Sequence, residues 1–191
     1  MASRDLDSRL NQREASAVQD WLADESAAFH FMRDHPAHSI EILGSGWGVR
    51  LGHIERNMID ETFVQAVQDP MFWAKRGAYG PDQGFLKRYL KCIFVCLNLC
   101  NCVFYITMSC RNISYNIYDY NRYIWPWGKW SAVSHDSYTC VNFPRTRAFP
   151  TQRKYDVPNN FVASVVEAND VMRQKCPERC RPPNHPDWEY C

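Results

Sequence analysis

The chain has 191 residues, which is long enough for one domain with a buried core and short for two. Its 22 Lys and Arg residues against 21 Asp and Glu residues give a formal net charge of +1, so nucleic acid and anionic membrane surfaces are disfavoured as partners. Nine cysteines indicate an oxidising compartment and an odd thiol, whereas the N-terminus has no basic-then-apolar leader that would direct the chain there.

An Asp-x-Asp motif opens the chain, in the segment SRDLDSRL. At the end of a strand, Asp5 and Asp7 could bind one divalent cation while the residue between them packs inward. A surface turn before a helix explains the same pattern. Asn11 and Glu14 then have the spacing of a capping box, and the apolar residues after them predict an amphipathic helix to about Asp24.

A buried strand is predicted over residues 28–33, directly before the polar loop 34–38. Because α/β folds bind ligands where a strand passes into a loop, we expect Arg33, Asp34 and His35 to contact a ligand. The segment ILGSGWG comes next, and its Gly44 and Gly46 allow either a close approach to a ligand or a plain turn.

Two further helices are predicted, from Asp60 to about Gln68 and from the segment YGPDQGFL onward. In the second, Asp82 and Gln83 fall in the first turn, where the positive end of the helix favours binding of a hydroxyl or an oxyanion. Ordinary preference for acidic residues in a first turn is the alternative.

The composition changes over residues 90–123, which include the uncharged run CIFVCLNLCNCVFYITM. About seventeen apolar residues are at the lower limit for crossing a bilayer, so a membrane span is not favoured. Arg88-Tyr89 precedes the segment and Arg122-Tyr123 ends it. We interpret residues 90–123 as a foreign insert that contributes nothing to the core.

The tail, residues 167–191, is rich in cysteine. Cys176, Cys180, His185 and Cys191 have zinc-ligand chemistry, but their gaps differ from those of a zinc knuckle. We therefore expect these cysteines, with Cys140, to form disulfides and to bind no zinc.

Five motifs in order, SRDLDSRL, HFMRDHPAH, ILGSGWG, YGPDQGFL and HDSYTC with FPTQR, resemble a family of glycosyltransferase-like proteins with a GT-A fold. The resemblance implies an α/β domain over residues 1–166, with a mixed sheet and flanking helices. It also implies that Asp5, Asp7 and His135 bind Mn²⁺ or Mg²⁺, and that Asp82 and Gln83 act on the transferred sugar. Arg33, Asp34, His35, Gly44 and Gly46 would contact the donor.

Such a domain forms its nucleotide pocket before the Asp-x-Asp motif, from roughly a hundred residues of alternating strands and helices. Only four residues precede Asp5. We therefore expect a fragment that lacks the nucleotide-binding half and is inactive alone. Its longer form would transfer a hexose from a nucleotide sugar to a glycan or hydroxyl acceptor, in the Golgi or ER lumen or outside the cell. The alternative is a non-catalytic sugar-binding or interaction module, or a non-functional product of a misread gene.

Overall fold

The computed structural model describes residues 2–40, 42–53, 131–138, 146–171 and 173–191, together with Asp60, Val64, 67–70, 83–84 and Leu86. The chain divides into two compact units, one of residues 1–50 and 132–191 and the other of residues 51–131. The described strands and helix α1 belong to the first unit, apart from the first residue of β4. The predicted insert, residues 90–123, lies outside the described residues. Among the described helices, none combines the length and apolar character that a membrane span requires.

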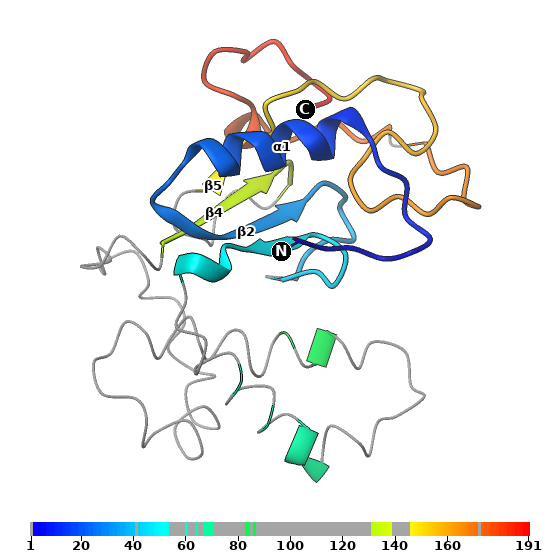
Figure 1. Ribbon diagram of the computed structural model, residues 1–191. Helices are drawn as coiled ribbons and strands as arrows, with labels where there is room; N and C mark the ends of the chain where they lie inside the picture. Colours follow the sequence, from blue (N-terminus) through cyan, green and yellow to red (C-terminus); the bar gives the residue numbers. More distant parts are fainter. Residues whose placement is uncertain are drawn as a thin grey trace. The chain divides into compact units, whose positions relative to one another are not determined.

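The first unit contains a mixed α/β arrangement, as the sequence predicted at this coarse level (Figure 1). Its five-stranded sheet has the order β1-β3-β2-β4-β5. The strands are β1 (Ala2–Ser3), β2 (Ala27–Arg33), β3 (Trp47–Val49), β4 (Ser131–Asp136) and β5 (Thr146–Arg147). β3 pairs antiparallel with both β1 and β2, whereas β4 and β5 are parallel. Figure 1 shows β2 and β4 running in the same direction.

Helix α1 (Gln12–Ala23) confirms the helix predicted after the Asp-x-Asp motif. Asn11 is its N-cap, and the Asn11 side-chain oxygen accepts a 2.8 Å hydrogen bond from the Glu14 main-chain N–H. Capping of this kind satisfies one of the N–H groups that the first turn leaves without a partner. Of the apolar residues that predicted this helix, Trp21 is buried and Val18 half-buried, whereas Ala15 and Leu22 are exposed. Arg13, Glu14 and Ala17 complete the buried face.

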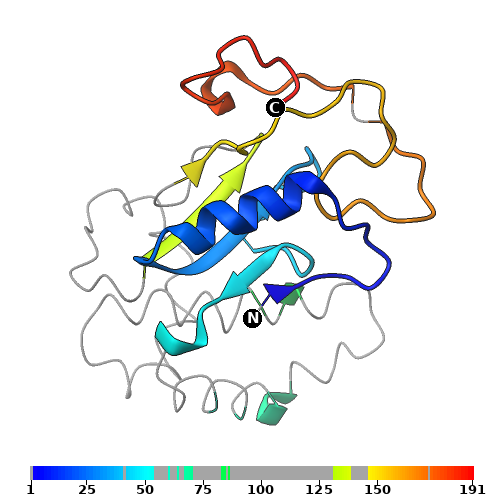
Figure 2. The ribbon, with the colours of Figure 1, turned by 45° about the horizontal axis from the view of Figure 1, so that its top comes forward.

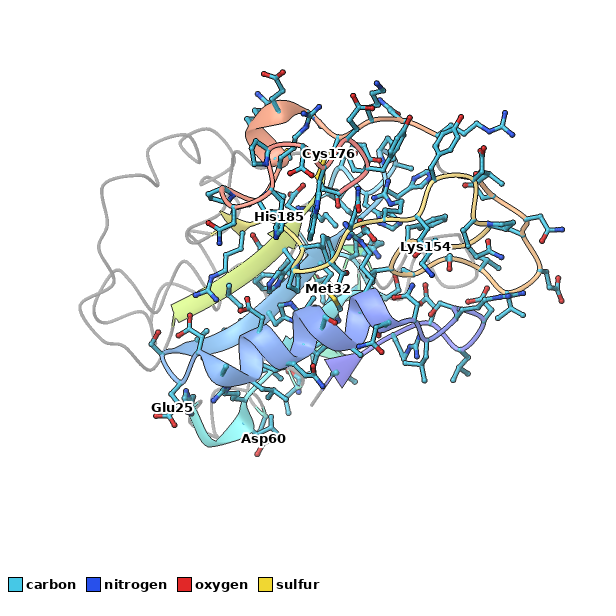
Figure 3. The ribbon with its side chains drawn as sticks, turned by 90° about the horizontal axis from the view of Figure 1, so that it is seen from above. Glu25, Met32, Asp60, Lys154, Cys176 and His185 are labelled. Atoms are coloured by element: carbon cyan, nitrogen blue, oxygen red, sulfur yellow. A yellow bond between two sulfur atoms is a disulfide. The ribbon has the colours of Figure 1, made fainter. Side chains whose placement is uncertain are left out.

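α1 covers one face of the sheet, over β2 and β4 (Figure 2). All seven residues of β2 are buried, as expected for a strand in the centre of the sheet. Met32, which is labelled in Figure 3, packs with Ala17, Phe149 and Val162 in one buried apolar cluster. A second cluster joins Trp21 to Ala27 and Val133. The core of the first unit therefore lies between α1 and the central strands.

A glycine is required where the loop after β2 returns to the sheet. The Met32 main-chain N–H donates a 2.7 Å hydrogen bond to the Gly46 oxygen. A Cβ atom on Gly46 would lie 2.9 Å from the Met32 main-chain oxygen, closer than real Cβ contacts allow. Gly46 therefore permits a close approach between two parts of the chain itself, and this explains its place in the motif without a ligand.

We expect Gly46→Ala to lower the free energy of unfolding by about 1–3 kcal/mol, because the backbone of a buried strand must shift to admit the methyl group. Gly52→Ala is the matched control, since a Cβ atom at Gly52 meets nothing within 4 Å. Chemical denaturation of both variants measures the difference. Equal stability of the two variants would contradict this packing.

Candidate functional site

The candidate site lies at the carboxyl ends of β2 and β4, where α/β sheets commonly place polar side chains. The chain leaves β2 at Asp34 and leaves β4 at Ser137. The Ser137 main-chain N–H donates a 3.0 Å hydrogen bond to the Arg33 oxygen, so the two strand ends are adjacent. The sequence predicted a polar site after β2. The polar residues at the end of β4 belong to the HDSYTC motif of the resemblance.

Asp34 is the centre of this site and is fully buried. Arg13 donates two hydrogen bonds to the Asp34 carboxylate, at 2.6 and 2.8 Å. Arg153 and Ser137 donate to its Oδ1 atom at 2.7 and 2.5 Å, and the main-chain N–H of Val162 donates to Oδ2 at 3.0 Å. The carboxylate thus joins α1, both strand ends and the segment 153–162.

The charges around Asp34 decide its ionisation. Burial alone would raise the pKa of Asp34, but the adjacent guanidinium groups of Arg13 and Arg153 outweigh that effect and lower it to about 2. Burial lowers the pKa of Arg13. At Arg153 burial also acts to lower the pKa, but the charges of Asp34 and Tyr138 and the hydrogen bonds to both together outweigh it and raise the pKa. Asp34 therefore acts as a permanent anion and offers no proton for acid catalysis near neutral pH.

A second buried ion pair connects the same strand ends. Arg33 is 3% exposed, and its Nε atom donates to the Asp136 carboxylate at 2.6 Å. The other carboxylate oxygen of Asp136 accepts a 2.8 Å hydrogen bond from the main-chain N–H of Tyr138. Arg33, predicted to contact a donor sugar, is thus held inside the sheet by its neighbour on β4.

His135, predicted as a metal ligand, is fully buried and both of its ring nitrogens have partners. Its Nε2 atom lies 2.8 Å from the Asp20 carboxylate, and its Nδ1 atom lies 2.9 Å from Nε2 of His30. The hydrogen bond to His135, with that from Arg147, lowers the pKa of Asp20 to about 2 against the effect of burial. An ionised Asp20 only accepts, so His135 carries its proton on Nε2 when neutral and accepts from His30 at Nδ1. A metal ion would have to displace one of these partners.

His35 and His38 form the more accessible part of the strand end. The His35 side chain is 22% exposed, lies 3.4 Å from the Asp170 carboxylate and contacts the Phe161 ring, with centroids 4.9 Å apart. Burial and the nearby His35 lower the pKa of His38 to about 4, and burial also lowers that of His35. His35, Phe161 and Asp170 thus combine a donor, an aromatic ring and an acceptor.

The Asp-x-Asp motif forms a surface turn after β1. Asp5 and Asp7 are exposed, and Leu6 between them is 104% exposed, so it does not pack inward as a strand-end cation clamp would require. The main-chain oxygens of Asp5 and Asp7 accept hydrogen bonds from the N–H groups of Ser8 and Val166. Within the described part of the chain, no group of three His, Cys, Asp or Glu side chains is placed to hold a metal ion.

The remaining predicted residues divide between the two units. Gly44 and Gly46 form the turn that leads into β3. Gln83 is helical, as predicted, but belongs to the unit of residues 51–131. Asp82 lies outside the described residues. The geometry therefore groups Arg33, Asp34, His35 and His135 at β2 and β4.

In the tail, the structure contains the disulfide Cys176–Cys191, with Cα atoms 6.0 Å apart. Cys180 is also disulfide-bonded, whereas Cys140 lies outside the described residues. Figure 3 labels Cys176 and His185; the His185 ring stacks on Trp188 with centroids 4.0 Å apart. A tail disulfide was predicted, and the two bridged cysteines have no thiolate to offer a zinc ion.

Sequence reasoning missed the partners of the buried charges, namely Arg13, Asp20, Ser137 and Arg153. Arginine is rarely buried, so the residue type of Arg13 gives no sign of its buried position. The one sequence signal was that Arg13 falls beside Ala17 and Trp21 on the buried helical face. Arg153 and Ser137 do belong to motifs of the resemblance, FPTQR and HDSYTC.

Comparison with known proteins adds no relative: no family model, no curated protein and no solved structure matches this chain. A functional proposal for the chain therefore rests on its sequence motifs, its fold and the contacts at the strand ends.

We expect Asp34→Asn to lower the free energy of unfolding by about 3–5 kcal/mol, because it leaves two buried guanidinium groups without their shared counter-charge. Asp156→Asn is the control: Asp156 is exposed, pairs with Arg173 at 3.2 Å and has a φ of 57°, which asparagine tolerates. The measurement is urea denaturation of both variants at pH 7. A loss below about 1 kcal/mol in Asp34→Asn would contradict the buried network.

Acid should destabilise the fold well before the carboxylates titrate. Burial lowers the pKa of His30 well below its ordinary value of 6.5, and it lowers that of His38 to about 4. The unfolded chain therefore binds more protons below pH 6.5, so stability is complete above that pH and falls as the pH drops towards 4. We expect His38→Asn to flatten the dependence of unfolding free energy on pH between about 7 and 5. His185→Asn, at an exposed position, should leave the slope unchanged, and equal slopes in the wild type and both variants would contradict the prediction.

Proposed function

We propose that this chain is part of a nucleotide-sugar-dependent glycosyltransferase, and that the carboxyl ends of β2 and β4 are its sugar-binding edge. One observation carries the proposal: three segments that resemble this family, far apart in sequence, are joined by buried polar contacts. Asp34 of HFMRDHPAH binds Ser137 of HDSYTC and Arg153 of FPTQR, at 2.5 and 2.7 Å. Contacts between these segments are what a shared site would need.

The chemistry of this edge suits a hydroxylated ligand. The partly exposed His35 and Asp170 side chains, 3.4 Å apart, carry a hydrogen-bond donor and an acceptor, and the buried Phe161 ring supports His35 from behind. Few but well-positioned polar groups against an apolar wall are typical of small-molecule sites. Arg13, Ser137 and Arg153 are buried behind this edge and would keep its backbone in position rather than touch the sugar.

The metal predicted for the family does not fit the residues as they are arranged here. His135 has both ring nitrogens engaged, and Asp5 and Asp7 lie in an exposed turn. Mn²⁺ or Mg²⁺ would offset charge on a leaving diphosphate, and that role needs ligands brought together around the ion. We therefore propose metal binding and sugar transfer for a longer form alone, with Asp5 and Asp7 as ligands.

A non-catalytic sugar-binding module is the second candidate. The full burial of His135 favours it, because the residue expected to bind the metal instead connects β4 to β2 and α1 through hydrogen bonds. In that case His35, Phe161 and Asp170 would bind sugar without any transfer. The two candidates share the edge and differ in the need for the Asp-x-Asp motif.

The test uses a form extended at the N-terminus and lacking residues 90–123, with donor hydrolysis or transfer measured in Mn²⁺. We expect turnover by the extended form, none by the 191-residue chain, and a loss of roughly a thousandfold or more in Asp7→Ala, which loses several kcal/mol of transition-state stabilisation. Asp156→Asn, which changes another exposed aspartate and is tolerated at its φ of 57°, should retain turnover. Unchanged turnover in Asp7→Ala would refute the role of the motif. Sugar binding without turnover, lost in His35→Ala, would establish the second candidate.

A further inference from the structure

Two buried guanidinium groups share one carboxylate beside the tail. Arg13 and Arg153 both pair with Asp34, at 2.6 and 2.7 Å, and each of the three residues is at most 3% exposed. Among the described side chains, Asp34 is the one carboxylate paired with either arginine. The side chains alone therefore leave one positive charge in excess, and an uncompensated buried charge is costly. The lowered pKa of Arg13, due to burial and partly to Arg153, agrees with this excess.

The same cluster has unused hydrogen-bonding capacity. The Nε atom of Arg153 and the Oγ1 atom of Thr151 are buried and have no hydrogen-bond partner in the described part of the chain. Most buried polar atoms in proteins do have partners, so such exceptions point to a missing water, ion or ligand. An N–H donor and a hydroxyl beside two guanidinium groups suit an anion.

Oxygen atoms of the tail occupy part of this position. Arg13 donates to the Cys191 oxygen, and the main-chain N–H of Arg153 donates to the Tyr190 oxygen at 2.6 Å. The Cys191 oxygen is a main-chain acceptor, so the tail offers Arg13 a hydrogen bond and the excess charge of the side chains remains. The disulfide between Cys176 and Cys191 closes residues 176–191 into a loop and holds Cys191 in place. Two main-chain oxygen atoms of the tail therefore already accept hydrogen bonds from Arg13 and Arg153.

We propose that Arg13 and Arg153 form a binding site for a phosphoryl group, and that the disulfide-closed tail covers it by placing the Cys191 oxygen on Arg13. Planar guanidinium groups match phosphate oxygens in geometry, and a phosphate would replace the Cys191 oxygen and supply the counter-charge that the side chains lack. The phosphoryl group could belong to free phosphate or to a nucleoside diphosphate. The site is independent of the proposed glycosyltransferase activity, since it needs neither the Asp-x-Asp motif nor turnover.

The experiment compares wild type with Cys176→Ser/Cys191→Ser by calorimetric titration with inorganic phosphate. When the tail occupies the site in most molecules, the apparent affinity for phosphate falls in proportion to the small fraction of molecules whose site is open. We therefore expect the double variant to bind phosphate about tenfold or more tightly. Arg13→Gln in the double variant should remove binding. Lys175→Ala is the control, because it breaks an exposed pair with Glu189 inside the tail and leaves the disulfide intact. Uridine diphosphate in a second titration distinguishes a nucleotide from free phosphate as the better ligand.

Hydrogen exchange in the wild type gives a second reading if the double variant does not fold. The Arg153 amide donates a hydrogen bond to the Tyr190 oxygen of the tail, so phosphate that displaces the tail should accelerate its exchange. Exchange of the Met32 amide, which is bonded within the sheet region, should not change. Equal phosphate affinity in the double variant and wild type, or unchanged Arg153 exchange, would overturn the proposal. Neither result depends on sugar transfer, so failure of this site and failure of the enzyme can be told apart.

Discussion

The carboxylate of Asp34 is the constraint on which the first unit depends. A carboxylate has about four lone-pair positions, and here charged and neutral donors from four residues in three other segments fill them. Removing any one donor takes a hydrogen bond from a buried charge, and such a bond contributes more than a typical neutral one. Helix α1, the ends of β2 and β4 and the segment 153–162 must therefore be in place together.

The loop that reaches Asp34 from residue 155 onward includes unfavourable backbone conformations. Asp156, Asn159 and Ala163 have φ values of 57°, 56° and 63°. Aspartate and asparagine tolerate this left-handed region, whereas alanine loses roughly 1–2 kcal/mol there. The hydrogen bond from Val162 to Asp34, and the packing of Val162 against Met32 and Phe149, offset that loss. A strained alanine is thus stabilised by the residue directly before it.

Local features of this fold could be predicted from the sequence because their causes are local. Asn11 caps α1 through its own side chain, and the apolar run after residue 27 forms the central strand. The tail disulfide was expected from cysteine spacing and composition. The buried ion pairs could not be predicted, because their partners are distant in sequence: Arg33 and Asp136, for example, are 103 positions apart. The sequence shows which residues are charged, but only the fold shows which charged residues lie close enough to pair.

His135 illustrates the difference between the type of a residue and its availability. Its position in the motif order matches a metal ligand of the resembled family, yet its Nε2 and Nδ1 atoms both have protein partners. One of these partners, Asp20, belongs to α1 and also pairs with Arg147 of β5 at 3.0 Å. Metal binding at His135 would therefore require Asp20 of α1 or His30 of β2 to give up its contact, and a neutral imidazole would have to be exposed from the core. Any metal binding through His135 must be coupled to a rearrangement of α1 or β2, because both ring nitrogens are engaged without one.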